Sequence, residues 1–443
     1  MAVILQLHIR HAAAAEAGDE PLQEVIVTAE RREENLQKAS LTIQVLGSGE
    51  IQRAGLSGAT DLSRVTTGVE IGVGGVNDQI FIRGVGSFAE SPLSAPGVAF
   101  NVDGIYVGRP DGIGANFYDV SRVEVLKGPQ GTLYGRNANG GSINVITNQP
   151  ELGVTSGGVD LTAGNFQLGR VQGFANVALG DTSALRAAFD VMHRDGYLSD
   201  HTDDDIHQAG RLRYKFKPSD GFSLLVNADY AHLGGRGGGS VWLPRRPGSD
   251  AYEATTAAAA NDYLHSFLPL GPLVDSQNPD SFQDSTLFNL SAQLDWDIGF
   301  ATLSVLPAYR HTDIDARTYN GLRYSQSEKT RQESLEARLG NGNSWLTWVV
   351  GTYYFNETPN GSIGVYQSNI LQNYLIDYQP TTKAAAGFGQ VTVSITDRFR
   401  LIGGGRYTHE HATLSGEINN QATDPVSLIE AFGGDKTFSG VDL

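Results

Sequence analysis

Long segments in which apolar and polar residues alternate make up the chain from about residue 154 onward. In segment 185–194, Leu185 and Phe189 fall on one face, whereas Arg186 and Asp190 fall on the other. Successive side chains of a β-strand point to opposite sides of the sheet, so this period of two predicts strands with one apolar and one polar face. The same pattern recurs in segments 211–217, 222–232 and 287–296.

The connections between these segments distinguish two kinds of β-structure. Strands of a soluble sandwich also alternate, but they average ~5–6 residues, and several segments here are longer than that. Short turns are expected at 180–183, 217–221, 297–299, 340–343 and 396–397. Longer loops are expected at 195–206, 234–283, 318–327, 356–381 and 412–436. Short turns on one side and long loops on the other are typical of outer-membrane barrels. We expect about eleven strands through His411 and a twelfth that starts near Phe438.

Composition excludes several classes of protein. The chain carries 49 acidic and 32 basic residues, a formal charge of −17, whereas nucleic-acid binding needs clustered positive charge. The absence of cysteine excludes disulfides, thiolate metal sites and cysteine nucleophiles. No run of 18 apolar residues predicts a transmembrane helix. Glycine accounts for 54 of 443 residues, which suits a protein rich in turns.

The region from residue 24 to about residue 150 has a different pattern, which predicts a compact α+β domain. Short strands are expected at 24–29, 42–46, 79–83, 98–102, 123–127 and 142–147. Ser48 could cap a helix over 49–54, and Thr60 could cap another over 61–65. Before this region, a short apolar stretch at 2–7 precedes small residues at 12–17, so residues 1–23 are interpreted as a leader or a degraded signal peptide.

The most specific motif lies at 122–147, RVEVLKGPQGTLYGRNANGGSINVIT, with VDGIY at 102–106 and IRG at 82–84 upstream. These motifs closely resemble the plug domain of TonB-dependent outer-membrane receptors. The resemblance implies an N-terminal α+β plug domain, residues 30–152, followed by antiparallel transmembrane β-barrel strands, residues 153–443. Full members close about 22 strands, so eleven or twelve would form an incomplete barrel, and we expect a fragment that does not transport alone.

Glycines in the motif have a physical reason. Gly128, Gly131, Gly135, Gly140 and Gly141 permit tight turns in a crowded lumen, including turns with positive φ.

The segment Glu24, Val25, Ile26, Val27, Thr28 and Ala29 is similar to the TonB box of the same family. This resemblance implies that the partner is the periplasmic end of the TonB energy-coupling protein. An extended peptide can add a strand to a partner's sheet edge, through which a pull is transmitted. The alternative is that residues 24–29 form an ordinary first strand of the plug domain.

A latch between plug and barrel is also implied by the resemblance, because plug arginines pair with barrel glutamates in this family. The matching residues are Arg83, Arg122, Arg136 and Glu336. Glu336 alternates with apolar neighbours, so it should face the lumen, where an ion pair contributes ~1 kcal/mol. The alternative partner of Glu336 is Arg338, on the same face of its own strand.

The loop at 234–283 is the candidate ligand site. Its aromatic and arginine side chains suit a planar, anionic chelate; they include Arg236, Trp242, Arg245, Arg246, Tyr252 and Tyr263. His409 and His411 share a strand face, and residues 203–205 form an acidic run, but we interpret both as polar surface rather than as metal sites.

Together these features predict active uptake of a large scarce solute across the outer membrane of a Gram-negative bacterium. Ferric siderophores are the commonest cargo that the resemblance implies; an oligosaccharide or cobalamin is the alternative. The expected partners are TonB, outer-membrane lipid and the transported ligand, with no nucleic acid. We expect no cofactor and no enzyme activity. Two alternative functions from other classes of protein are a passive porin, which would lack a plug, and a β-rich surface protein that does not transport.

Overall fold

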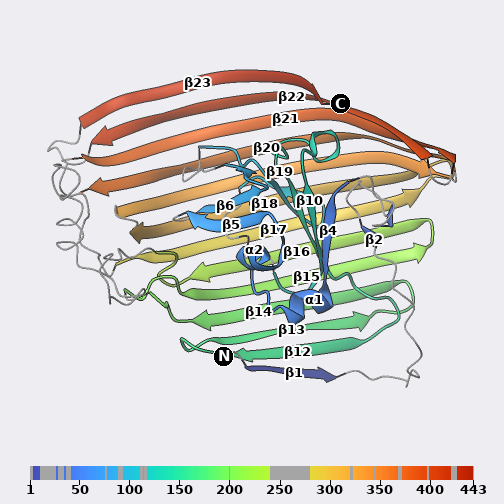
Figure 1. Ribbon diagram of the computed structural model, residues 1–443, viewed down its shortest axis with the longest axis horizontal. Helices are drawn as coiled ribbons and strands as arrows, with labels where there is room; N and C mark the ends of the chain where they lie inside the picture. Colours follow the sequence, from blue (N-terminus) through green and yellow to red (C-terminus); the bar gives the residue numbers. More distant parts are fainter. Residues whose placement is uncertain are drawn as a thin grey trace.

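The computed structural model shows a small α+β domain seated against one face of a large antiparallel sheet (Figure 1). It describes residues 3–9, 26–27, 34–35, 41–74, 77–87, 93–109, 113, 117–198, 200–239, 280–319, 323–343, 345–367, 372–396, 399–420 and 427–442. Among these residues, no helix combines the length and the apolar character that crossing a bilayer requires.

The plug domain is built on a five-stranded sheet with the order β4-β10-β11-β8-β9. Its strands are β4 (Ile43–Gly47), β8 (Ala99–Val102), β9 (Ile105–Val107), β10 (Val120–Lys127) and β11 (Gly141–Thr147). A three-stranded sheet, β5 (Val69–Gly74), β6 (Asn77–Ile82) and β7 (Val85–Gly86), lies beside it. The short helices are α1 (Ser48–Arg53), η2 (Ala59–Asp61), α2 (Leu62–Val65) and α3 (Gly131–Tyr134). Buried aliphatic side chains such as Val123, Val125 and Ile143 form its core.

The plug strands expected at 42–46, 79–83, 98–102, 123–127 and 142–147 are confirmed, whereas only residues 26–27 of the one expected at 24–29 are described; the helix caps are not confirmed. Helix α1 begins at Ser48 itself with Gly47 as its N-cap, and α2 has Asp61 as its N-cap, in neither case with a side-chain cap hydrogen bond. The Asp61 carboxylate instead accepts hydrogen bonds from the backbone of Ser57, at 2.7 Å, and of Gly58, at 3.2 Å. The side chain that organises this turn therefore lies one residue after Thr60.

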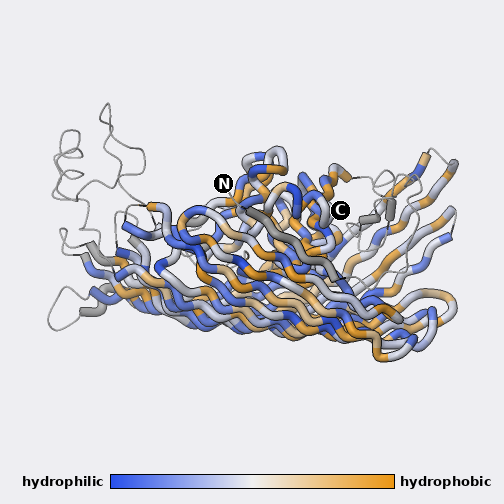
Figure 2. Tube along the Cα trace, turned by 90° about the horizontal axis from the view of Figure 1, so that it is seen from below, coloured by the Kyte–Doolittle hydropathy of each residue, from blue (hydrophilic) through white to orange (hydrophobic). Residues whose placement is uncertain are grey.

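Twelve antiparallel strands, β12 to β23, follow the plug and pair in chain order. They are β12 (Ser156–Ala163), β13 (Gly169–Ala178), β14 (Ser183–Arg194), β15 (Asp205–Ser219), β16 (Phe222–Gly234), β17 (Phe282–Asp297), β18 (Thr302–Tyr319), β19 (Arg323–Gly342), β20 (Leu346–Gln367), β21 (Gln372–Thr396), β22 (Phe399–Asn420) and β23 (Ser427–Asp442). The sheet is open, with β23 at one edge, and it curves around the plug (Figure 2). The predicted fold class, a plug domain followed by an incomplete antiparallel barrel, is confirmed.

At the other edge of this sheet, β1 (Val3–Ile9) pairs antiparallel with β12. These residues belong to the segment interpreted as a leader. That interpretation stays a prediction, and residues 10–25 lie outside the described part of the chain.

Four of the five short turns are confirmed, and the fifth, at 396–397, lies partly outside the described residues. Three of the expected long loops are wrong. Residues 318–327, 356–381 and 412–436 are largely strand, because β18 and β19, β20 and β21, and β22 and β23 extend far past the alternating segments. Segment 327–333, within β19, is polar on both faces, so hydropathy does not reveal it as strand. Main-chain pairing nevertheless continues, from Ser327 with Ser362 to Glu333 with Asn356.

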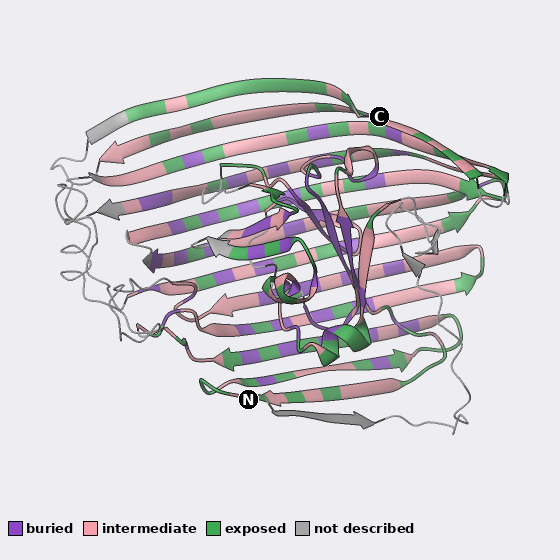
Figure 3. Ribbon diagram, in the orientation of Figure 1, coloured by how far each residue is buried: buried purple, intermediate pink, exposed green. Residues whose placement is uncertain are grey.

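Alternation sorts the barrel side chains as expected. Along β15, Leu212 is 49% exposed on the outer face, while its neighbours Arg211 and Arg213 are 3% and 2% exposed on the inner face. Figure 3 shows the same alternation of buried and exposed positions along many barrel strands. The polar face of the sheet is thus the face that carries the plug.

Gly141 provides a test of the plug core. It has a φ of +143°, and an added Cβ would collide with the carbonyl oxygen of Leu126. We expect Gly141→Ala to destabilise the plug by about 2 kcal/mol. The loss of stability would be measured as faster amide hydrogen exchange in β10 and β11. Gly47→Ala is the control, because nothing lies within 4 Å of a Cβ added there. Equal exchange rates in the two variants would contradict the close packing of Gly141 against the Leu126 carbonyl.

Candidate functional site

The contact between plug and barrel is organised by four arginines on the inner face of β13 to β15. Arg170, Arg186, Arg211 and Arg213 are all buried, with at most 7% exposure. They occupy alternate positions on the polar face of their strands, which is why they point away from lipid. Each of them donates hydrogen bonds to the plug.

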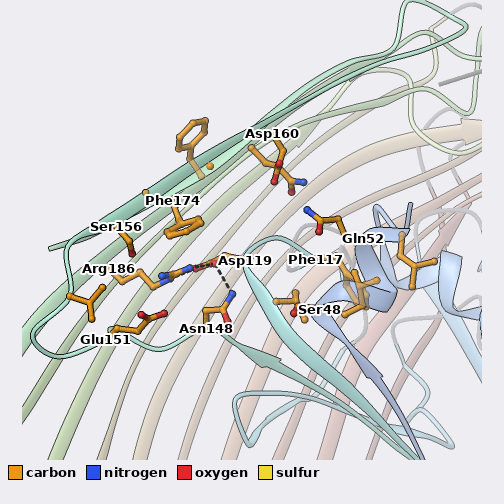
Figure 4. A pocket seen from close by; sticks show the side chains of 18 of the residues that line it. Ser48, Gln52, Phe117, Asp119, Asn148, Glu151, Ser156, Asp160, Phe174 and Arg186 are labelled. Carbon is orange, nitrogen blue, oxygen red and sulfur yellow. Dashed lines mark hydrogen bonds and ion pairs between the residues drawn. The ribbon is translucent and has the colours of Figure 1, made fainter. Parts of the chain in front are cut away.

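Arg186 makes a bidentate pair with the plug. Its Nε and Nη2 lie 2.7 and 2.6 Å from the two carboxylate oxygens of Asp119, and the guanidinium lies 3.9 Å from the ring centroid of Phe174. Asn148 donates a 2.8 Å hydrogen bond to the same carboxylate. Figure 4 shows Arg186, Asp119 and Asn148 joined in this way. Charge-assisted bidentate pairs of this kind are among the strongest hydrogen-bonded contacts in proteins.

Arg213 makes a second anchor to the plug. Its Nη2 lies 3.2 Å from the carboxylate of Asp103, and its Nη1 donates to the Thr147 hydroxyl and, at 2.9 Å, to the Asn148 carbonyl. Asp103 in turn accepts hydrogen bonds from the Thr147 backbone and hydroxyl, at 2.9 and 2.7 Å. The two anchors therefore meet at the end of β11.

Asp103 and Asp119, which carry the two plug carboxylates, have an unusual backbone conformation. Asp103 has a φ of +49° and Asp119 a φ of +50°, in the left-handed region that few non-glycine residues occupy. Asp103 and Gly104 form the two-residue turn between β8 and β9, where Asp-Gly is favoured because both positions need positive φ. Local geometry thus aims these carboxylates at the barrel wall.

Arg170 and Arg211 differ from the other two because their carboxylate partners belong to the barrel. Arg170 pairs with Asp190 at 2.8 and 2.6 Å, and Arg211 pairs with Asp229. Toward the described residues of the plug they donate to backbone carbonyls, those of Phe117 at 3.4 Å and Tyr118 at 3.0 Å.

The Tyr118 ring lies against the barrel wall, 4.5 Å from the guanidinium of Arg211. Burial raises the pKa of the Tyr118 phenol, which therefore stays neutral.

The opposite wall, formed by β19 to β22, holds the plug through different contacts. Gln332 donates to the Tyr106 carbonyl at 2.7 Å and accepts from the Gly108 amide at 2.9 Å. A Cβ on Gly108 would meet the Glu357 carboxylate, so a larger residue there would have to displace that side chain. The ion pairs on this side are longer: Arg109 with Glu328 at 3.7 Å and Arg136 with Glu410 at 3.4 Å.

The structure places the predicted latch residues in separate environments. Arg136 meets a barrel glutamate, but it is Glu410 rather than Glu336. Arg122 pairs with Glu124 on its own strand at 2.8 Å. Arg83 is exposed in the turn between β6 and β7.

Glu336 is buried on the inner face, as expected, and the alternative pairing is observed, with Arg338 at 2.8 Å. A latch that opens during transport stays a prediction.

Only part of the predicted TonB box is described. Ile26 and Val27 form β2 (Ile26–Val27), which pairs with β3 (Glu34–Asn35) in a separate two-stranded sheet. In the described part of the chain, β2 has no partner in the five-stranded plug sheet. Glu24, Val25, Thr28 and Ala29 lie outside the described residues.

Of the candidate ligand residues, only Arg236 is described. Its backbone amide donates to Asp204 at 2.7 Å and its guanidinium to the Asp200 carbonyl at 3.0 Å, which ties loop 195–204 to the end of β16. Trp242, Arg245, Arg246, Tyr252 and Tyr263 lie outside the described residues.

Sequence reasoning missed the two strongest anchors, Arg186 with Asp119 and Arg213 with Asp103. Arg186 and Arg213 were visible as polar members of alternating strands, and Asp103 as part of the VDG motif. Their pairing spans 67 residues in one case, so only the folded chain brings them together.

The Arg186 anchor can be tested by a change that keeps its charge. Lysine cannot reproduce a bidentate fork, so Arg186→Lys should weaken local plug seating by about 2 kcal/mol. The Asn148 amide, which donates to the Asp119 carbonyl at 2.9 Å, is the reporter. Its hydrogen exchange should accelerate roughly thirtyfold. The control is Lys217→Gln, which removes an exposed ion pair with Asp220 and should leave this exchange unchanged. If Arg186→Lys does not accelerate the exchange either, Arg186 does not anchor the plug.

Comparison with known proteins agrees with this architecture. The family described as TonB-dependent Receptor Plug Domain matches residues 35–142, and the family described as TonB dependent receptor-like, beta-barrel matches residues 234–439. The pesticin receptor of Yersinia pestis is 24% identical over 422 residues, covering 90% of this chain and 58% of that protein. The catecholate siderophore receptor Fiu of Escherichia coli K12 is 31% identical over 237 residues, covering 49% of this chain and 28% of that protein.

A solved structure shares the fold. The ferric yersiniabactin uptake receptor FyuA from Yersinia pestis superposes with a TM-score of 0.74 at 19% identity, covering 91% of this chain and 60% of that one. The chain thus spans somewhat more than half the length of the pesticin receptor. With both domains matched in the expected order, the chain belongs to the family of TonB-dependent receptors, of which it carries the plug domain and a run of barrel strands.

Proposed function

We propose that this chain serves TonB-dependent uptake of a ferric siderophore across the outer membrane of a Gram-negative bacterium. The observation that carries the proposal is a folded plug held on the inner face of a membrane sheet by charged contacts to both walls. Such a plug blocks passive flow, so transport needs a way to displace it.

The segment on which TonB would pull, the proposed TonB box, includes strand β2. Among the described residues, β2 pairs with β3 and not with the five-stranded plug sheet, and β4, an edge strand of that sheet, follows it in the chain. An extended segment of this kind can pair with the sheet edge of a partner, for which the family implies TonB. Force applied there reaches β10 through the pairing of Ile43 to Gly47 with Leu126 to Arg122.

The similar proteins favour iron chelates as cargo. Two of them are named a catecholate siderophore receptor and a ferric yersiniabactin uptake receptor. Transport by displacement of a plug needs no bond chemistry, so the proposal assigns no enzyme activity. An oligosaccharide or cobalamin receptor would differ in its loops, and competition by these solutes in the uptake assay tests that alternative.

Energy coupling can be tested at a single position of the proposed box. Val27→Pro removes a main-chain donor, whereas Val27→Thr keeps a residue that favours strands. In cells that express the receptor, Val27→Pro should abolish uptake of a radiolabelled ferric chelate and leave surface binding intact. Val27→Thr should retain both. Full uptake by Val27→Pro would refute the box, and a surface protein without transport would show no uptake in any variant.

The proposed latch can be tested at Glu410. Loss of its ion pair with Arg136 should lower the free energy of plug seating by ~1 kcal/mol, because the pair is only partly buried. Glu410→Ala should therefore lower the urea concentration at which the plug is released from the barrel, followed by a spin label on β10. The exposed Glu417 of the same strand is the control. A release midpoint equal to that of Glu417→Ala would remove Arg136 and Glu410 from the latch.

A further inference from the structure

Two like charges lie side by side in the barrel wall. Arg186 on β14 and Arg213 on β15 are direct register partners, and both are almost fully buried. Side chains in this relation have Cβ atoms ~5 Å apart, and like charges directly opposite each other destabilise a sheet. Their other register partners on the inner face are the neutral residues Asn176 and Asn227.

The charge of this pair is balanced by the plug. In the described part of the chain, the ion pairs of Arg186 and Arg213 are those with Asp119 and Asp103. The contrast with Arg211 is informative, since its carboxylate partner Asp229 belongs to the barrel. Any motion that withdraws the two plug aspartates would therefore leave two adjacent guanidinium groups without their anions.

We propose that Arg186 and Arg213 form an anion receptor whose resting occupants are the plug carboxylates, and that a carboxylate-bearing solute replaces them when this part of the plug moves. Guanidinium forks bind carboxylates in a bidentate manner, the geometry that Asp119 already shows with Arg186. Two neighbouring forks suit an anion with two or more carboxylates. The proposal rests on the proposed transport function and names the chemistry of its cargo.

One member of the pair, Arg186, borders a cavity. Arg186 and Asp119 line a space of about 700 Å³ between α1, the end of β11 and strands β12 to β14. Its wall also carries Glu151 and Asp160 (Figure 4). With Asp119 in place, the carboxylates outnumber the guanidinium in this wall, which disfavours entry of an anion. The resting plug therefore occupies the receptor, and withdrawal of Asp119 would lower the negative charge of this wall.

Neutral isosteres can unmask the receptor without moving the plug. Asn tolerates positive φ and keeps a carbonyl oxygen, so Asp103→Asn with Asp119→Asn should preserve both turns. The probes are tricarballylate, a tricarboxylate, and inorganic phosphate, measured by titration calorimetry on the full chain in detergent. We expect the double variant to bind tricarballylate at least tenfold more tightly than the unaltered chain does. Adding Arg186→Gln and Arg213→Gln should abolish this gain.

A matched control separates the pair from a single arginine. Asp229→Asn frees Arg211, which faces Ala188 rather than another arginine on β14. It should show no comparable gain in affinity. A gain of equal size, a double variant that binds no better than the unaltered chain, or a gain that survives loss of both arginines would each overturn the proposal. Binding of phosphate without tricarballylate would overturn the assignment to a carboxylate.

Folding gives a second readout. If the double variant folds poorly, tricarballylate should raise its refolding yield, and only while Arg186 and Arg213 are present. Failure of this rescue in a poorly folding variant would count against the receptor. Because these assays use purified chain without TonB, they can fail while Val27→Pro still blocks uptake in cells, so the two proposals are judged separately.

Discussion

Pairing of backbone amides between neighbouring strands is the constraint on which the rest of this structure depends. A segment that faces lipid cannot hydrogen-bond to water, so each strand of the barrel must satisfy its main chain through its neighbours. The unbroken order of β12 to β23 supplies those partners, with pairs such as Leu303 and Leu339 in antiparallel register. Period-two alternation then follows: one side chain in two faces lipid, and the next is free to be polar.

The polar face of the barrel sheet is stabilised by the plug that packs against it. Arginines that would be costly in lipid are placed on the inner side of β13 to β15, where plug carboxylates and carbonyl groups receive them. The two walls hold the plug differently. Beside β13 to β15 the ion pairs to the plug are buried and include the bidentate pair of Arg186 with Asp119, whereas beside β19 to β22 the ion pairs are longer and Gln332 makes backbone contacts. The strongest plug–barrel ion pairs, Arg186 with Asp119 and Arg213 with Asp103, therefore have the opposite polarity to that implied by family resemblance, with the arginine on the barrel and the acid on the plug.

Only parts of the candidate site could be predicted from the sequence. Glu336 was expected on the inner face and is there; Arg136 was expected to meet a barrel glutamate and does. The specific partners were not predictable, because a lumen contact joins residues whose strands are set by register rather than by distance along the chain. Arg122 and Glu336 illustrate this, since each has a closer partner, Glu124 and Arg338, two residues away on its own strand.

Sequence by itself determined the two-part architecture, the short turns, and which face of each strand is apolar, because these depend on local motifs and on the fixed period of a strand. The tertiary structure alone decided how far the polar strand ends extend, since main-chain pairing needs no hydropathy pattern. It also decided that Arg186 and Arg213 lie opposite each other and that Asp119 and Asp103 neutralise them. Charge balance in the lumen is a property of the assembled plug and barrel, and no segment of the chain contains it alone.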